Sequence, residues 1–494
     1  MAEEYLIAID QGTTSTRVLA FSLAGDILAL TQKEFKQYYP NNGWVEHDCE
    51  EIWQKTLECL QSVINEQSSF GRKALAIGIT NQRETILIWD AKTGMPLSKA
   101  IVWQDRRTSD YCHDMKTLGN EPMISEKTGL ILDPYFSASK INWLLNNEGV
   151  RAKAKAGEVR TGTIESYLVY RLTAGKSHVT DLSNASRTML CNIMTGKWDE
   201  DLLKLFDIPQ SILPSITDNA GNFGKVTEGL PGATIPITGL IGDQQSAAIG
   251  QGCIRDGMVK STYGTGCFML QNTGHKRHYS GHKLLSTVAF SLNGNISYAL
   301  EGSIFNAGTV TQFLRDQVEF ISDARQTEAI CKSMDNTGGV YMVPAFTGLG
   351  APHWNPNARG ILTGLTRATT QNQIVRAGLE SVAYQSADLL KAFTADIGAN
   401  PDVIRVDGGM SANDWLMQYL ADILNICIER PINTETTAYG AAIMAGLGAG
   451  VWDTIESATQ SWRLDTKFSP HMDTNQRESL LYTWGKNVEC CKNL

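Results

Sequence analysis

The chain has 494 residues, of which 42% are hydrophobic and 19% charged, an ordinary composition for a globular enzyme of roughly two to four domains. Its net charge of −9, with no basic stripe carrying interleaved aromatic residues, argues against nucleic-acid binding. The N-terminus lacks a signal-peptide pattern, and the longest apolar stretch, residues 439–452, is shorter than the ~20 residues of a membrane span. We therefore expect a cytoplasmic protein without membrane insertion.

The first segment predicts three antiparallel strands. Residues 5–10 form a short apolar run that ends in an acid, residues 17–21 form a second apolar run, and a turn at residues 23–26 leads into a third strand from Ile27. A dinucleotide-binding βαβ unit would not open in this way.

A helix and two further strands follow. The pattern predicts a helix from Cys49 to about residue 64, with Asp48 as its N-cap and two acidic residues in its first turn. Residues 74–80 and 85–90 are typical of strands on either side of a polar tetrad. Strands and helices alternate beyond this point, so the fold class is α/β.

The second half of the chain partly repeats the first. Residues 258–263 predict a strand that leads into Gly-Thr-Gly at 264–266, much as the first strand leads into Gly-Thr-Thr at 12–14. No period of 20–50 residues indicates a repeat array. The echo and the chain length together predict two domains, residues 1–250 and 251–494.

Two strand ends suit the phosphates of a nucleotide, although neither a P-loop nor a G-x-G-x-x-G motif is present. Residues 10–17 combine a carboxylate that can hold Mg²⁺ through water, a glycine and four hydroxyls that can cradle phosphate, and a cation. Residues 262–268 repeat the glycine and hydroxyls. Either segment alone fits a polar turn, and both together favour two loops around one polyphosphate. A third turn at 407–409, with Asn413 available for an adenine edge, is weaker support.

Phosphoryl transfer to an alcohol needs a base, and Asp243 is the candidate. It follows the apolar run 235–241 and precedes Gln244 and Gln245. Asp serves as the base in many kinases, but the same position also suits a helix N-cap, and one residue can fill both roles.

A polyol pocket is indicated by two other groups of residues. Arg83 can donate to one hydroxyl while Glu84 accepts from its neighbour, and a surface ion pair is the alternative. Trp103 and Tyr135 stand in polar surroundings, where they could pack against a carbon chain or fill a core.

Cysteines and histidines give no sign of a metal site. The ten cysteines include no C-x-x-C pair, which indicates free thiols, and we expect Cys490 and Cys491 to be exposed. His275, His278 and His282 lack a Cys or carboxylate framework, so we expect an exposed loop there.

These residues resemble the FGGY family of carbohydrate kinases over essentially the whole chain. Residues 135–147 fit the first family signature, and residues 360–380 fit the second, except that Gly378 stands where the pattern allows other residues. The segments most similar to family members that phosphorylate glycerol are residues 10–17, 81–84, 242–245, 263–269 and 345–354.

The resemblance implies two actin-like (ribonuclease-H-like) ATPase domains with the active site in the cleft between them. It implies that Asp243 is the general base, that Arg17 neutralises charge during transfer, and that Asp10 and Asp243 hold Mg²⁺. The residues expected to bind ATP are Thr13, Thr14, Ser15, Arg17, Thr265, Gly308, Gln312, Gly409 and Asn413. The residues expected to bind glycerol are Arg83, Glu84, Trp103, Tyr135, Asp243, Gln244 and Phe268.

The implied reaction is transfer of the γ-phosphate of ATP to glycerol, giving sn-glycerol 3-phosphate and ADP, in glycerol catabolism. One alternative is another family kinase acting on a pentulose or similar sugar, which would need a larger pocket than Trp103 and Phe268 leave. The other is an actin-like ATPase without a small-molecule acceptor, which would have no use for a polyol pocket. We also expect a homo-oligomer, a dimer or a tetramer.

Two positions depart from the family pattern. Glu165 stands where relatives usually carry Asp. In the turn at residues 232–236, Thr234 stands where some bacterial relatives have an Arg that binds a sugar bisphosphate inhibitor, so we do not expect such inhibition.

Overall fold

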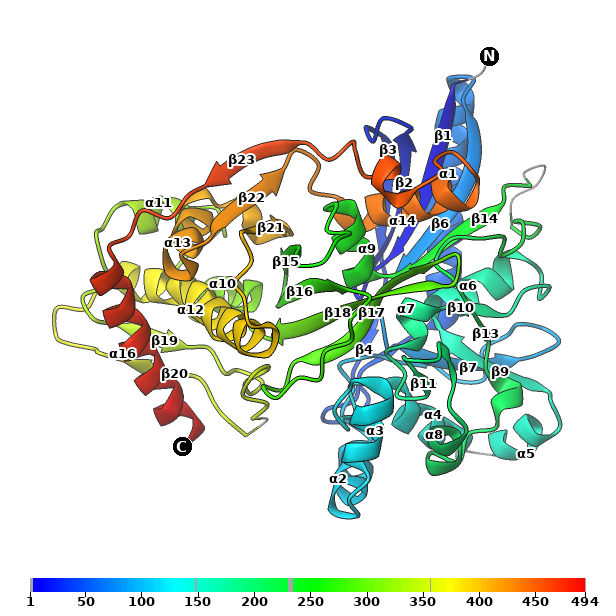
Figure 1. Ribbon diagram of the computed structural model, residues 1–494, viewed down its shortest axis with the longest axis horizontal. Helices are drawn as coiled ribbons and strands as arrows, with labels where there is room; N and C mark the ends of the chain where they lie inside the picture. Colours follow the sequence, from blue (N-terminus) through cyan, green and yellow to red (C-terminus); the bar gives the residue numbers. More distant parts are fainter. Residues whose placement is uncertain (1–2, 147–148, 230–233, 356, 494) are drawn as a thin grey trace.

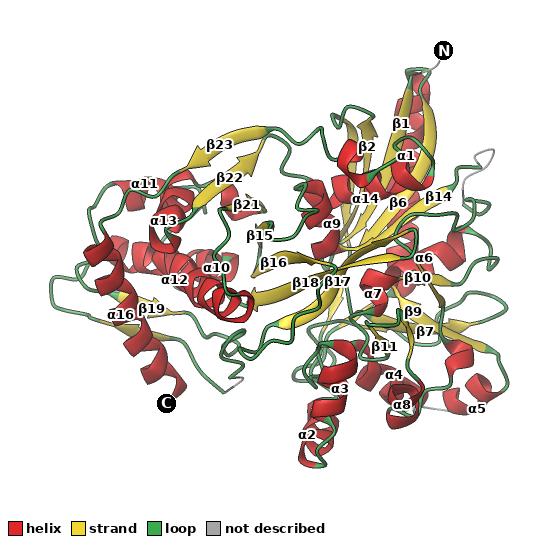
Figure 2. Ribbon diagram, in the orientation of Figure 1, coloured by secondary structure: helices red, strands yellow, loops and turns green. Residues whose placement is uncertain are grey.

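The computed structural model of the protein describes residues 3–146, 149–229, 234–355 and 357–493, and the chain forms two domains that lie side by side (Figures 1 and 2). Each domain is built around one large sheet, of five strands in the first domain and seven in the second. Helices cover the sheets, so the fold class is α/β, as the sequence predicts. Among the residues described, no helix combines the length and the apolar character needed to cross a membrane.

The first sheet brings three strand ends to one edge. Its strands, in spatial order, are β14 (Ile237–Gly242), β6 (Lys73–Asn81), β1 (Glu4–Gln11), β2 (Ser15–Ser22) and β3 (Ile27–Glu34). β1, β2 and β3 are antiparallel, as predicted, whereas β1, β6 and β14 run parallel to one another. The carboxyl ends of parallel strands meet at the same edge, so the residues that follow β1, β6 and β14 come together there.

The second sheet repeats this pairing. Its strands, in spatial order, are β17 (Leu285–Leu292), β18 (Asn295–Ile304), β16 (Cys267–Gly274), β15 (Val259–Tyr263), β21 (Val403–Asp407), β22 (Cys427–Pro431) and β23 (Leu464–Phe468). β15 pairs antiparallel with β16 and parallel with β21, just as β1 pairs with β2 and β6. The similarity between the two halves of the sequence is therefore also present in the pairing of their strands.

A third sheet of short strands extends the first domain. Its strands are β4 (Gln37–Tyr38), β5 (Glu46–His47), β8 (Ala100–Ile101), β7 (Ile86–Asp90) and β9 (Val159–Thr163). The predicted strand at residues 85–90 is β7, so the polar tetrad before it lies where the chain passes from the first sheet to the third. The other elements of this domain are α2 (Ser109–Thr117), α3 (Glu121–Thr128), α4 (Ser137–Leu145), α5 (Val150–Lys155), α6 (Ile164–Leu172), β10 (Val179–Asp181), α7 (Leu182–Ala185), β11 (Cys191–Asn192), β12 (Lys197–Trp198), α8 (Glu200–Leu205) and β13 (Ser215–Thr217).

The first long helix begins where the sequence predicts and ends later. α1 spans Cys49–Ser69, and the Asp48 carboxylate accepts hydrogen bonds from the backbone N–H groups of Glu50 and Glu51 at 3.0 and 3.2 Å. The predicted end near residue 64 is too early because no glycine or proline interrupts the helix, and buried Gln67 ties its last turn to the carbonyl oxygen of Leu28.

A helix from the second half of the chain covers the first sheet. α14 (Thr436–Gly448) packs on β1, β6 and β14, and it crosses α9 (Asp243–Gly250), which follows β14 (Figure 1). A Cβ atom at Gly440 would lie 1.9 Å from the Ser246 carbonyl oxygen, so the two backbones approach as closely as only glycine permits. The other elements of the second half are α10 (Gly308–Asp316), α11 (Gln326–Lys332), β19 (Tyr341–Val343), β20 (Ile361–Thr363), α12 (Gln371–Ile397), α13 (Asp414–Leu424), α15 (Ile455–Ala458) and α16 (Thr474–Lys492).

The cysteine and histidine predictions hold in part. All ten cysteines are free thiols, and Cys490 is exposed, but Cys491 is buried and its thiol donates to the carbonyl oxygen of Arg359. The prediction failed for Cys491 because neighbouring residues on α16 point to different sides of the helix. His275 and His282 are exposed and His278 is half-buried, all three in a loop, and His282 pairs with Asp396 at 2.7 Å.

We predict that Gly440→Ala destabilises the protein by about 1–3 kcal/mol, because the added methyl group meets backbone that cannot yield. Thermal unfolding measures the loss. The control is Gly485→Ala, since Gly485 lies exposed on α16 with open space around it, and alanine there should stabilise by up to about 1 kcal/mol. An equal melting temperature for the two variants would contradict the close crossing of α9 and α14.

Candidate active site

The turn after β1 holds the first predicted phosphate segment. The Gly12 N–H donates to the Ser15 carbonyl oxygen at 3.0 Å, which closes the hairpin and leaves Thr13 and Thr14 at its tip. Arg17 forms ion pairs with Asp10 and, across the domains, with Glu435 at 2.6 Å. The segment therefore presents hydroxyls and a cation whose charge two carboxylates already balance.

The turn after β15 is built in the same way and meets a helix N-terminus. The Gly264 N–H donates to the Gly266 carbonyl oxygen at 2.9 Å, and Thr265 is exposed. The Gly308 N–H, at the start of α10, donates to the Gly264 carbonyl oxygen at 3.0 Å, and a Cβ atom at Gly308 would lie 2.5 Å from that oxygen. Gln312 lies one turn further along α10 with its side chain exposed.

The turn after β21 lies beside the turn after β15. Gly408 has a φ of 87°, and a Cβ atom there would lie 2.5 Å from the Tyr263 carbonyl oxygen, so only glycine fits. The space around Gly409 is open. The Asn413 side chain caps α13, accepting from the Leu416 N–H at 3.0 Å and donating to the Thr327 hydroxyl at 3.2 Å. Its amide is thus engaged within the protein.

Asp243 lies at the end of β14 and begins α9. Gly242 is the N-cap, so the N-cap interpretation of Asp243 is wrong, because the helix starts at Asp243, one residue earlier than that interpretation requires. The Asp243 carboxylate accepts from the Gln244 N–H at 2.7 Å, and 29% of its side chain is exposed, so a substrate can reach it. Its Oδ1 lies 3.1 Å from Nε of Arg83.

Arg83 and Glu84 are buried, so they do not form the surface ion pair considered as an alternative. Nη1 and Nη2 of Arg83 donate to the two carboxylate oxygens of Glu301 at 2.5 and 3.1 Å. Arg187 donates from Nη2 to Glu301 at 2.9 Å and from Nε to Glu84 at 2.7 Å. The result is a chain of alternating charges, Asp243, Arg83, Glu301, Arg187 and Glu84, which we call the charge chain.

The charge chain sets the ionisation of its carboxylates. Burial raises the pKa of Asp243 to about 6, against the opposing effect of the Arg83 charge. Burial also acts to raise the pKa of Glu301, but Arg187 and Arg83 outweigh it and hold that pKa at about 2. Asp243 is therefore ionised at neutral pH and can accept a proton near pH 6, which suits a general base.

Three aromatic residues from both domains lie together beside the first turn. The Trp103 ring centroid lies 5.6 Å from Tyr135 and 6.4 Å from Phe268, both edge to face. The Trp103 indole N–H donates to the Thr13 hydroxyl at 3.0 Å. The predicted polyol pocket and the predicted phosphate turn are therefore in direct contact.

The comparisons with known proteins agree with this arrangement. The family models for the N-terminal and C-terminal domains of the FGGY family of carbohydrate kinases match residues 5–250 and 259–449. The chain belongs to the FGGY family of carbohydrate kinases. The resemblance inferred from the sequence is thus confirmed.

The relatives of this FGGY kinase match it along nearly their whole length. The glycerol kinase of Ectopseudomonas mendocina is 54% identical and covers 97% of each chain, and glycerol kinase 1 of Pseudomonas aeruginosa is 53% identical and covers 98% of each. The crystal structure of Plasmodium falciparum glycerol kinase with ADP is similar with a TM-score of 0.93 at 40% identity, over 99% of this chain and 98% of that one. A xylulose kinase from Lactobacillus acidophilus shares the fold, with a TM-score of 0.88 at 21% identity over 99% and 97%. The predicted pair of actin-like ATPase domains is confirmed.

Five residues that contact the predicted site were given no role in it by the sequence analysis of this FGGY kinase. They are Arg187, Gln245, Lys260, Glu301 and Glu435, and all of them contact a predicted site residue. The available signal was a charge inside a buried strand, because Lys260 on β15 and Glu301 on β18 interrupt otherwise apolar or small side chains. Burying a charge is unfavourable without a partner, so a charged residue inside a buried strand indicates an ion pair or a hydrogen-bonded site.

The two departures from the family pattern leave the predicted site untouched. Glu165 is buried, accepts from the hydroxyls of Thr163 and Thr180 at 2.6 and 2.7 Å, and has a pKa that burial raises to about 8. Thr234 is exposed, while Gly232 and Ala233 of the same turn lie outside the described residues.

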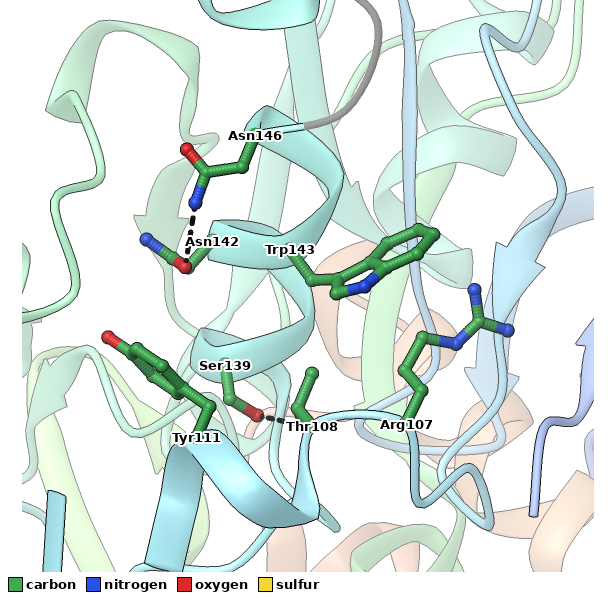
Figure 3. A pocket seen from close by; sticks show the side chains of 7 residues that line it. All are labelled: Arg107, Thr108, Tyr111, Ser139, Asn142, Trp143 and Asn146. Carbon is green, nitrogen blue, oxygen red and sulfur yellow. Dashed lines mark hydrogen bonds between the residues drawn. The ribbon is translucent and has the colours of Figure 1, made fainter. Parts of the chain in front are cut away.

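A surface hollow of about 230 Å³ lies between the start of α2 and α4 (Figure 3). Within it, the Thr108 and Ser139 hydroxyls are hydrogen-bonded at 2.8 Å. Its lining residues are Arg107, Thr108, Tyr111, Ser139, Asn142, Trp143 and Asn146. None of them is a predicted ATP or glycerol ligand, so this hollow is separate from the candidate active site.

We predict that Glu301→Gln lowers the free energy of unfolding by about 3–5 kcal/mol, because two buried guanidinium groups lose their shared carboxylate. Denaturant titration measures the change. The control is Asp26→Asn, which breaks the Asp26–Arg463 pair, whose side chains are 59% and 60% exposed, and should cost about 0–1 kcal/mol. Similar losses of stability for both variants would contradict a stabilising role for the charge chain.

Proposed function

We propose that this FGGY kinase is a glycerol kinase that transfers the γ-phosphate of ATP to a terminal hydroxyl of glycerol, giving sn-glycerol 3-phosphate and ADP, in glycerol catabolism. The observation that carries the proposal is the position of Asp243, a reachable carboxylate that contacts Arg83 at the same end of the sheet as the first phosphate turn. Relatives named glycerol kinase at 53–54% identity over nearly the whole chain support the choice of substrate.

Three groups of residues would hold glycerol for attack. Arg83 and Glu84 would bind its hydroxyls from the charge chain, which keeps both side chains fixed before substrate arrives. Trp103 and Phe268 would pack against the three-carbon backbone and limit its size. Asp243 would accept the proton of the terminal hydroxyl as that oxygen attacks the γ-phosphorus in line.

The two phosphate turns would hold ATP from opposite domains. Thr13, Thr14 and Ser15 would contact phosphate oxygens on one side, with Thr265 and the α10 N-terminus at Gly308 on the other. Arg17 is already in place, and phosphate would compete with Glu435 for its guanidinium group. That charge would stabilise the phosphoryl oxygens during transfer, a type of contribution worth roughly 10²–10³ in rate. Gln312, Gly409 and Asn413 remain proposed nucleotide contacts.

The residues present suit Mg²⁺ held largely by water and phosphate. Asp10 and Asp243 supply carboxylate oxygens, the ligand type that Mg²⁺ prefers. The described part of the chain offers no group of three or more acidic, His or Cys side chains that would bind a metal by themselves. Bound Mg²⁺ would neutralise charge on the β- and γ-phosphates.

We also propose the domain division at residue 250, where α9 ends, because the second family model begins nine residues later, at residue 259. A cytoplasmic location and a homo-oligomer, a dimer or a tetramer, remain part of the proposal.

We predict strong glycerol-dependent ADP release from the purified protein with MgATP, with sn-glycerol 3-phosphate as the product. A coupled ADP assay and chiral analysis of the product measure both. Xylulose and ribulose are the control acceptors, because a pocket closed by Trp103 and Phe268 should exclude a five-carbon sugar.

Two outcomes would overturn the proposal. Faster turnover on a pentulose than on glycerol would favour another FGGY sugar kinase. ADP release that ignores every acceptor would favour an actin-like ATPase without a small-molecule substrate.

A further inference from the structure

The ammonium group of Lys260 is enclosed by residues of the candidate polyol site. The side chain is fully buried, and Nζ donates to Oε1 of Gln244 at 2.5 Å, to the Phe268 carbonyl oxygen at 3.2 Å and to the Thr262 hydroxyl at 3.0 Å. A lysine ammonium has three N–H donors, so all of them are used within the protein. Lys260 therefore does not bind a substrate directly, and it holds two residues that are proposed to do so.

The strand geometry explains this position. Side chains alternate along β15, so Lys260 and Thr262 share one face of the strand, and Thr262 pairs with Phe268 on β16. That face meets the first turn of α9, which carries Gln244. The charge is not isolated, because Asp407 and Glu301 attract it and oppose the effect of burial, which lowers the pKa of Lys260.

Lys260 also fixes which way the Gln244 amide points. An ammonium group only donates, so the atom of Gln244 that faces it must be the carbonyl oxygen Oε1. The NH₂ group then points the other way, and no residue in the described part of the chain accepts a hydrogen bond from it. An acceptor for this NH₂ group must come from outside the protein.

The donor of Gln244 and the acceptor of its neighbour Asp243 match the hydrogen-bonding groups of an alcohol. A hydroxyl oxygen can accept one hydrogen bond while its proton is donated to another group. The Gln244 NH₂ group supplies a donor, and the ionised Asp243 carboxylate supplies an acceptor.

We propose that Lys260 is a positioning residue that locks the Gln244 amide with its NH₂ group toward the polyol, so that Gln244 binds a glycerol hydroxyl through that hydroxyl's oxygen. The role rests on the proposed glycerol kinase activity. A reversed amide would present its carbonyl oxygen beside the Asp243 carboxylate and would repel the hydroxyl oxygen. Lys260 thereby selects ligands that offer a hydrogen-bond acceptor at this point.

A double-mutant cycle tests the role. Lys260→Met and Gln244→Ala should each raise the KM for glycerol about five- to tenfold, the effect of losing one hydrogen bond, with a smaller change in kcat. The double variant should be no more than about twofold worse than the more impaired single variant, because Lys260 acts through Gln244. The control is Lys127→Met, since Nζ of Lys127 donates to Asp199 and Asp201, neither of them a proposed ligand, and this variant should leave KM within about twofold.

A second variant keeps the test valid should Lys260→Met fail to fold. Gln244→Glu leaves Lys260 in place and pairs with it, but its carboxylate cannot donate, so KM should rise as in Gln244→Ala while the melting temperature stays near that of the wild type. Wild-type affinity for glycerol in Gln244→Glu, or multiplied effects in the double variant, would overturn the role of Lys260. Absence of glycerol-dependent turnover in the wild type would overturn the proposed function and, with it, this role of Lys260. ADP binding by each variant shows separately that the variant is folded.

Discussion

The bidentate ion pair between Arg83 and Glu301 joins the two domains at the place where the phosphoryl acceptor would bind. Arg83 follows β6 of the first sheet, and Glu301 lies on β18 of the second. Both side chains are buried, so removing either would leave a charge without water or partner. Arg187 and Asp243 extend the pair into the charge chain, in which each charge has an opposite neighbour. The charge chain holds Arg83 and Glu84, the side chains proposed to bind the polyol, in place before any ligand arrives.

A second ion pair between the domains is more exposed to solvent than the Arg83–Glu301 pair. The Arg17–Glu435 pair also crosses the domains, but its side chains are 27% and 30% exposed. Solvent weakens such a pair, and phosphate can replace one partner at little cost. A bound phosphate would therefore change the contact at Arg17 and leave the buried Arg83–Glu301 pair intact. This division suits an enzyme that must align two substrates from opposite sides.

Local patterns predicted the parts of the fold and the site that depend on neighbouring residues. The antiparallel opening, the Asp48 cap and the turns after β1 and β15 are all short-range features, and all are present. Local patterns could not predict the charge chain, because Glu301 is more than 200 residues from Arg83 in the sequence. The two residues come together only because the two sheets meet in the fold. The packing of α14 on the first sheet is hidden for the same reason.

The position of a residue in the sequence does not show what surrounds its side chain in the fold. Some predictions failed for this reason. Arg83 and Glu84 resemble a surface ion pair in sequence, yet each pairs with a distant partner inside the protein. Cys491 is buried next to exposed Cys490 because the two point to different sides of α16. The Asn413 amide also caps α13, and its contact with the nucleotide stays a prediction.

The central claim is that Asp243, held by Arg83, is the base that accepts the glycerol proton. The most direct measurement is the pH dependence of kcat/KM for glycerol in the wild type and in Asp243→Asn. An ionised base is lost as pH falls through its pKa, so the wild-type value should fall about tenfold per pH unit below an apparent pKa of about 6. Asp243→Asn should fold normally, lose about 10²–10⁴ in rate and lack that acid limb. Near-normal kcat in Asp243→Asn, or an unchanged acid limb, would contradict the account.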